Sequence, residues 1–322
     1  MKVQTIFRIP SPYRDDFRVK AYTFGGGEKS LCIVGSMRGD EIQQLYVASC
    51  MVRELKEAEE HGLIAPGVCI SVIPCANPSS INIEKRFWAL DGTDINRMFP
   101  GYDGGETTQR IAAGIFDFVK EYRYGVQLAS YYLPGNFLPH VRLLHTCFEN
   151  VEEAHLFGLP YVVVSDPKPI DTVLLNYNWQ IWDTQAYSLY AGTTDVIDQD
   201  MARVTIQAIR RYMRNKRLTL TPDSERDTEA VDTQKTQRSV VVPQNIMTDI
   251  KAPRAGLLIP QTFAGRRVKA GQTLAHILHP CEGYRLCDVV SPADATVFFL
   301  RNKSICFQNT LLFRLISENF DE

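Results

Sequence analysis

The stretch Ser30-Leu-Cys-Ile-Val-Gly-Ser36 decides the fold, because it is short, mostly apolar and bounded by polar residues. Such a run is typical of a buried strand. A segment of helical period follows at 40–61, and a second apolar run stands at 68–73. A strand, a helix and a further strand in succession indicate a sheet with crossover helices. The pattern continues to residue 220, with helices expected at 109–122 and 198–218 and strands at 125–129 and 161–165.

The C-terminal part of the chain has a different pattern. Residues 221–238 are rich in Pro, Ser, Thr, Gln and acidic residues, which predicts a polar linker. From residue 239 onward, short strand-like runs alternate with turns, and no long helix is indicated. The sequence thus predicts an α/β domain with an open mixed sheet flanked by helices at 1–220, a linker at 221–238, and a small all-β domain at 239–322.

The charge balance excludes two classes of partner. The 322 residues include 35 Lys and Arg and 37 Asp and Glu, so the formal net charge is 35 − 37 = −2. This balance provides no electrostatic field for holding a nucleic-acid backbone or an anionic membrane surface.

No stretch approaches the roughly 18 uninterrupted apolar residues of a membrane span, and the first 22 residues lack the apolar core of a signal peptide. We therefore expect no nucleic acid, no membrane and a cytoplasmic location.

The eight cysteines are predicted to be structural thiols of the core. A pair three positions apart, as in Cys-x-x-Cys, would indicate a zinc knuckle or a redox motif, and the sequence has none. A thiol among apolar neighbours behaves as a small hydrophobic group. Disulfides are also rare in a cytoplasmic chain.

Donor side chains follow the strand expected at 68–73. The chain continues as Pro74-Cys-Ala-Asn-Pro78, then Arg86, then Asp91-Gly-Thr-Asp-Ile-Asn-Arg-Met-Phe-Pro-Gly101. A strand followed by Asn-Pro leaves the carboxyl edge of an open α/β sheet, where ligands bind. The guanidinium groups of Arg86 and Arg97, with the amide of Asn96, suit a carboxylate because paired charge-assisted bonds fix its position and plane. We predict a site for a small carboxylate-bearing molecule; the alternative is a surface network of Arg and Asp.

These motifs resemble those of the succinylglutamate desuccinylase/aspartoacylase family, which are zinc amidohydrolases with a zinc carboxypeptidase-like fold. The resemblance includes Gly35-Ser-Met-Arg-Gly-Asp-Glu41, residues 73–78, the run ending at Gly101, and C-terminal turns such as Lys269-Ala-Gly-Gln272. It implies that the all-β part is a barrel-sandwich accessory domain. It also implies that Arg86, Asn96 and Arg97 hold the carboxylate of the substrate.

The zinc positions that this resemblance implies are altered. The family's His-Gly-x-Glu turn reads Arg38-Gly-Asp-Glu41 here, and Ala129 stands where the family has a further histidine ligand. Catalytic zinc needs three protein ligands, so we expect no metal cofactor. We hypothesise that Arg38 takes the place of the metal's positive charge and pairs with Glu41. The family's general base aligns on Tyr190, which makes Glu41 and Tyr190 the candidate catalytic residues.

Three functions stay open at this stage. The first is a degenerate family member that binds a small carboxylate-bearing ligand without zinc, with Arg38 and His140 also lining the pocket. The second is an active hydrolase of N-acyl amino acids or related amides and esters. It would use Glu41 and His140 to hold a metal, or Arg38 and Tyr190 to act on a carbonyl. The third is a structural or regulatory subunit. A homo-oligomer is compatible with each.

Overall fold

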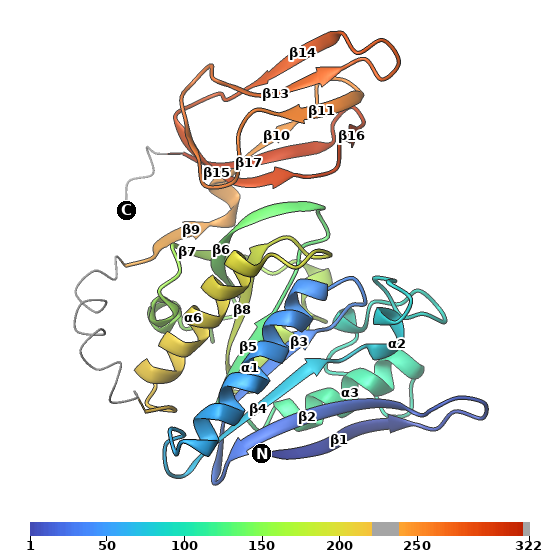
Figure 1. Cartoon of the computed structure of the whole chain (residues 1–322), viewed down its shortest axis with the longest axis vertical. Helices are drawn as coiled ribbons and strands as arrows, with labels where there is room; N and C mark the ends of the chain where they lie inside the picture. The colour runs from blue at the N-terminus through green and yellow to red at the C-terminus, as the bar shows by residue number, and fades with distance from the viewer. Residues whose placement is uncertain (221–237, 318–322) are drawn as a thin grey trace. The chain divides into compact units, whose positions relative to one another are not determined.

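The computed structural model describes residues 1–220 and 238–317 and divides into two compact units (Figure 1). Unit 1 comprises the described parts of Met1–Ser130, Pro139–Tyr190 and Thr194–Val241. Unit 2 comprises Tyr131–Leu138, Ala191–Thr193 and the chain from Val242 onward. The predicted linker at 221–238 lies outside the described residues, except for Arg238.

Unit 1 is built on an open mixed sheet, which confirms the predicted α/β class. The central strands pair in parallel, and an antiparallel hairpin extends the sheet at one side. Across the sheet, the strands are β1 (Lys2–Ile9), β2 (Phe17–Gly25), β4 (Val68–Cys75), β3 (Glu28–Ser36), β5 (Tyr124–Leu128), β8 (Gln185–Gly192), β6 (Gly135–Leu144), β7 (Tyr161–Ser165) and β9 (Val240–Pro243).

Helices cover both faces of this sheet because alternate strand residues point to opposite sides. In β3, Leu31 and Ile33 belong to the core that includes α1 (Ile42–Glu60) and α6 (Gln199–Asn215). Cys32 and Val34 belong to the second core, which includes α3 (Thr107–Val119). Figure 1 shows α1 and α6 side by side over one face. The shorter helices are α2 (Pro78–Ile81), α4 (Val151–Ala154) and α5 (Leu175–Ile181).

The structure contains the predicted helices and strands and several strands that were not predicted. The sequence analysis did not predict β1, β2 or β8. The helix predicted at 109–122 begins at Thr107, where the Gln109 side chain accepts a hydrogen bond from the backbone N–H of Glu106. None of the described helices is both long and apolar enough to cross a membrane.

Unit 2 is antiparallel β structure, as predicted for the C-terminal part. One layer has the order β14-β13-β11-β16; in the other, β17 pairs with β10 and β15, and β15 also pairs with β12 and with residues 135–137 of β6. Its core holds Leu258, Ile277, Val297 and Phe313. The strands are β10 (Thr248–Lys251), β11 (Gly256–Pro260), β12 (Arg267–Val268), β13 (Thr273–Leu278), β14 (Arg285–Val290), β15 (Ala295–Arg301), β16 (Ile305–Cys306) and β17 (Leu311–Ser317).

Candidate functional site

The turn between β3 and α1 carries the first residues of the site. β3 ends at Ser36 and α1 begins at Ile42, so the turn lies at the carboxyl end of a central strand. Gly39 is required there, because a Cβ would stand 2.1 Å from the Lys85 carbonyl oxygen. The Gly39 N–H donates to the carbonyl oxygen of Arg86 at 3.2 Å. This close approach brings Arg38 and Arg86 to the same edge of the sheet.

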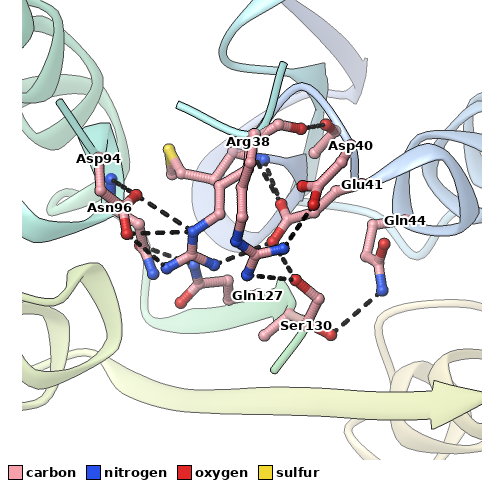
Figure 2. A network of polar contacts seen from close by, with 12 residues as sticks. Arg38, Asp40, Glu41, Gln44, Asp94, Asn96, Gln127 and Ser130 are labelled. Atoms are coloured by element: carbon pink, nitrogen blue, oxygen red, sulfur yellow. Dashed lines mark hydrogen bonds and ion pairs between the residues drawn. The ribbon is translucent and has the colours of Figure 1, made fainter. Parts of the chain in front are cut away.

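The guanidinium of Arg38 lies between two carboxylates (Figure 2). Its Nη1 donates to Glu41 Oε1 at 3.0 Å, and its Nη2 donates to Asp94 Oδ2 at 2.9 Å. Its Nε contacts both Asp94 oxygens at 3.1 Å. The side chains of Arg38, Glu41 and Asp94 are only 4%, 1% and 7% exposed, so solvent screens these ion pairs weakly. The predicted Arg38–Glu41 pair is present, and Asp94 is a second partner that the sequence analysis missed.

The acceptor capacity of Glu41 is fully used. Oε2 accepts from the backbone N–H groups of Met37 and Arg38 at 2.8 and 3.0 Å. Oε1 accepts from Arg38 Nη1 and from Ser130 Oγ, the latter at 2.6 Å. Since a carboxylate offers about four lone-pair sites, four donors saturate it. Any other ligand of Glu41 must displace one of them.

Arg86 lies on the other side of Glu41 and joins the same network. Its Nη1 donates to Asp40 Oδ2 at 2.7 Å, and its Nη2 contacts Ser130 Oγ at 3.4 Å. Ser130 follows β5, and its hydroxyl donates to Glu41. Because the same oxygen contacts Arg86, Ser130 connects Arg86 to Glu41. The side chain of Arg86 is 18% exposed, so this guanidinium is more open to solvent than that of Arg38.

Asn96 and Arg97 belong to a short 3-10 turn, Ile95–Arg97, which Asp94 caps by accepting from the backbone N–H of Asn96. The Asn96 Oδ1 accepts from Gln127 Nε2 at 2.9 Å. Arg97 donates from Nη1 to the carbonyl oxygen of Ile170 at 2.9 Å, and its Nε lies 3.7 Å from Asp94 Oδ2. Asp94 therefore contacts both Arg38 and Arg97.

His140 and Tyr190 lie on the neighbouring strands β6 and β8. Their rings stack in parallel with centroids 5.2 Å apart and an angle of 8° between the planes. His140 has no exposed surface and Tyr190 is 9% exposed. His140, which was predicted to line the pocket, is thus a buried residue that packs against Tyr190.

Residues 28–215 match the family described as the succinylglutamate desuccinylase/aspartoacylase catalytic domain. The chain belongs to this family. The match covers more than half of the 322 residues and includes the turn at 37–41, Arg86, the 94–97 segment, His140 and Tyr190. A search of curated proteins found no match.

Solved structures share the fold over nearly the whole chain. A succinylglutamate desuccinylase/aspartoacylase from Rhodobacter sphaeroides has a TM-score of 0.76 and 17% identity, covering 99% of this chain and 96% of its own. A succinylglutamate desuccinylase from a Silicibacter species has a TM-score of 0.75 at 14% identity, with 97% and 93% covered. The product-bound ectoine utilization protein EutE from Ruegeria pomeroyi has a TM-score of 0.74 and 14% identity, and the match covers 97% of this chain and 94% of its own.

The charges of the site balance, but over more groups than the sequence analysis considered. A single Arg38–Glu41 pair gives 1 − 1 = 0. The network contains Arg38, Arg86 and Arg97 against Asp40, Glu41 and Asp94, so the sum is 3 − 3 = 0. Asp40 and Asp94 both stand in the motifs quoted in the sequence analysis. Their ion-pair partners could not be predicted from the sequence, because pairing depends on which loops meet at the sheet edge.

Cys75 is the last residue of β4 and lies at this edge of the sheet. Burial raises its pKa to about 12. At pH 8 only about one Cys75 thiol in ten thousand is then the reactive thiolate. By contrast, Cys147 and Cys281 are exposed, so the prediction of a core position was wrong for these two. Each is placed on a polar surface segment, 145–150 or 279–284, where there is no apolar layer to bury it.

We expect iodoacetamide at pH 8 to alkylate Cys147 and Cys281 and to leave Cys75 unmodified in the folded protein. Cys147 and Cys281 are exposed to the reagent, whereas Cys75 is only partly accessible and its raised pKa keeps its reactive thiolate scarce. Peptide mass spectrometry after brief treatment measures this, with urea-unfolded protein as the control in which all eight react. Alkylation of Cys75 at the rate of Cys147 would contradict the assignment.

Proposed function

We propose that this chain is a metal-free member of the family that binds a small carboxylate-bearing ligand and does not hydrolyse it. The observation that supports this most strongly is the position of Arg38, whose guanidinium is held between the buried carboxylates of Glu41 and Asp94. In the family, a zinc ion would supply positive charge in this turn. Arg38 supplies it here as part of the chain.

The residues of the site do not fit a zinc ion. Zinc requires deprotonated ligands with free lone pairs, usually three from the protein in a catalytic site. The four hydrogen bonds to Glu41 leave it no lone pair for a metal. Arg38 and Ala129 offer no ligand at the two positions where the resemblance implies histidines. Within the described residues, no three His, Cys, Asp or Glu side chains cluster in a way that could hold a metal.

The ligand would be held by the more exposed donors of the network. Arg86 and Arg97, with side chains 18% and 24% exposed, remain reachable, whereas Arg38 at 4% does not. Asn96 completes the set, and Gln127 fixes the orientation of its amide by donating to Oδ1. Two guanidinium groups and an amide favour a carboxylate over a neutral group. An N-acyl amino acid or a short peptide provides such a carboxylate.

The hydrolase alternative finds less support in these contacts. It needs Arg38 to polarise a carbonyl, yet the N–H groups of Arg38 already serve Glu41 and Asp94. Its proton donor would be Tyr190, whose ring is stacked on His140. Its metal route needs Glu41, whose lone pairs are occupied. A cytoplasmic location stays a prediction for either function.

Binding is tested by thermal shift with N-succinyl-L-glutamate, N-acetyl-L-aspartate and a panel of mono- and dicarboxylates at millimolar concentration. A ligand that binds only the folded state must raise the melting temperature. We expect a rise for at least one carboxylate and its loss in Arg97→Ala, because Arg97 is needed for the charge-assisted bonds. Arg203→Ala, an exposed arginine on α6, is the matched control and should keep the rise. No rise with any carboxylate would favour a structural or regulatory subunit.

A further inference from the structure

A large cavity in unit 1 lies outside the site described above. It has a volume of about 1100 Å³ and is lined by the β1–β2 hairpin, the end of β4, α2 and residues 82–90. None of Arg38, Glu41, Arg86 or Asp94 lines it. Its size is that of a small-molecule site, and its lining combines apolar side chains with a few polar groups, as such sites do.

Two basic side chains of the lining make no ion pair among the described residues, although Asp15 and Asp16 also line it. Lys20 on β2 and Arg14 in the hairpin loop line the cavity, and neither makes an ion pair or a side-chain hydrogen bond within residues 1–220 and 238–317. Arg18 also lines it but is paired with Asp16 at 3.1 Å. Counting Asp15 and Asp16, the charge of the lining is 3 − 2 = +1. The two unpaired cations therefore favour an anionic group.

Two large aliphatic side chains of the lining are exposed. Leu90 and Ile83 are 69% and 51% exposed, although large aliphatic side chains gain free energy when they are covered. Trp88 lines the cavity as well and packs edge-on against Phe17 at 5.1 Å. Its indole N–H is buried and has no hydrogen-bond acceptor among the described residues.

We propose that this cavity binds an organic anion of small-molecule size. The acidic group of the ligand pairs with Lys20 and Arg14, and its apolar body covers Leu90 and Ile83. This site does not depend on the function proposed above. Charge complementarity distinguishes an organic anion from a neutral apolar compound of the same size.

The fluorescent anion 1-anilinonaphthalene-8-sulfonate tests this proposal, with N-phenyl-1-naphthylamine as the matched neutral dye that lacks the sulfonate. We expect the full-length protein to bind one sulfonated dye per chain and to bind the neutral dye about tenfold more weakly. In Lys20→Glu the Kd of the anion should rise by at least about tenfold, since the reversal removes a charge-assisted contact and adds repulsion. Leu90→Asp should weaken both dyes.

Lys2→Glu is the control for the charge reversal, because Lys2 stands at the other end of the same hairpin and does not line the cavity. It should leave both Kd values unchanged. Equal affinity of the wild-type protein for the two dyes, an unchanged Kd in Lys20→Glu, or no binding of the anion would each overturn the proposal. Lys20 and Leu90 are exposed, so unchanged unfolding midpoints should show that these variants fold.

Discussion

The double variant Arg38→His/Ala129→His should bind one zinc ion per chain, whereas the wild-type protein is expected to bind none. The first change removes the guanidinium that pairs with Glu41 and frees one Oε1 lone pair of that carboxylate. The two histidines then provide two imidazole ligands beside Glu41, which is the His/Glu/His set implied by the family resemblance. Three ligands suffice for a catalytic-type zinc site. Isothermal titration with zinc chloride should give one site per chain with a Kd at or below about 1 μM.

The single variant Ala129→His is the matched control for this gain. It adds the same imidazole but keeps Arg38 between Glu41 and Asp94, so it should bind zinc no better than the wild type. The single variant Arg38→His has only two of the three ligands and should bind more weakly than the double variant. If the double variant binds no more zinc than Ala129→His, position 38 does not lie where the family binds its metal.

Replacement of Arg38 by methionine should cause the largest loss of stability at the site. The change removes the cation and leaves Glu41 and Asp94, with side chains 1% and 7% exposed, without their shared partner. Breaking a buried ion pair in this way costs about 3–5 kcal/mol of the free energy of unfolding. All three tryptophans, Trp88, Trp179 and Trp182, belong to unit 1. Urea unfolding followed by tryptophan fluorescence therefore reports on the unit that holds the site.

Arg203→Met controls for the loss of an arginine as such. Arg203 pairs with Asp200 at 3.0 Å on the surface, and this variant should change stability by less than about 0.5 kcal/mol. The triple variant Arg38→Met/Glu41→Gln/Asp94→Asn should recover part of the loss, because it removes the two buried carboxylate charges that Arg38 neutralised. A loss in Arg38→Met no larger than that in Arg203→Met would mean that the buried ion pairs do not stabilise the fold.

The helices and strands that could be predicted were those with a clear hydrophobic pattern in their own sequence. Continuous apolar runs and helical periods identified β3, α1, β4 and α6 within a few residues. The β1–β2 hairpin was missed because its strands interleave charged and apolar residues, whereas the sequence analysis relied on continuous apolar runs to identify strands. β6 carries Pro139 in its interior, a residue that argues against a strand in a sequence.

The contacts of the site are of two kinds, those within one turn and those between segments far apart in the sequence. The pair formed by Arg38 and Glu41 spans three residues within one turn, and it was expected from the family resemblance, which put Arg38 in the place of the metal's charge. The contact from Arg38 to Asp94 spans 56 residues, and the hydrogen bond from Ser130 to Glu41 spans 89. Such contacts depend on which loops the parallel sheet brings to one edge. The hydrophobic and charge pattern of the sequence does not specify which residues form these distant contacts.

The metal content of the wild-type protein tests the replacement of zinc by Arg38 most directly. The chain is expressed in zinc-supplemented medium, purified without chelators and measured by inductively coupled plasma mass spectrometry. We expect less than about 0.1 zinc per chain, since the site residues leave a divalent cation no ligand set. One zinc per chain in the wild type, lost in Glu41→Ala, would contradict the account.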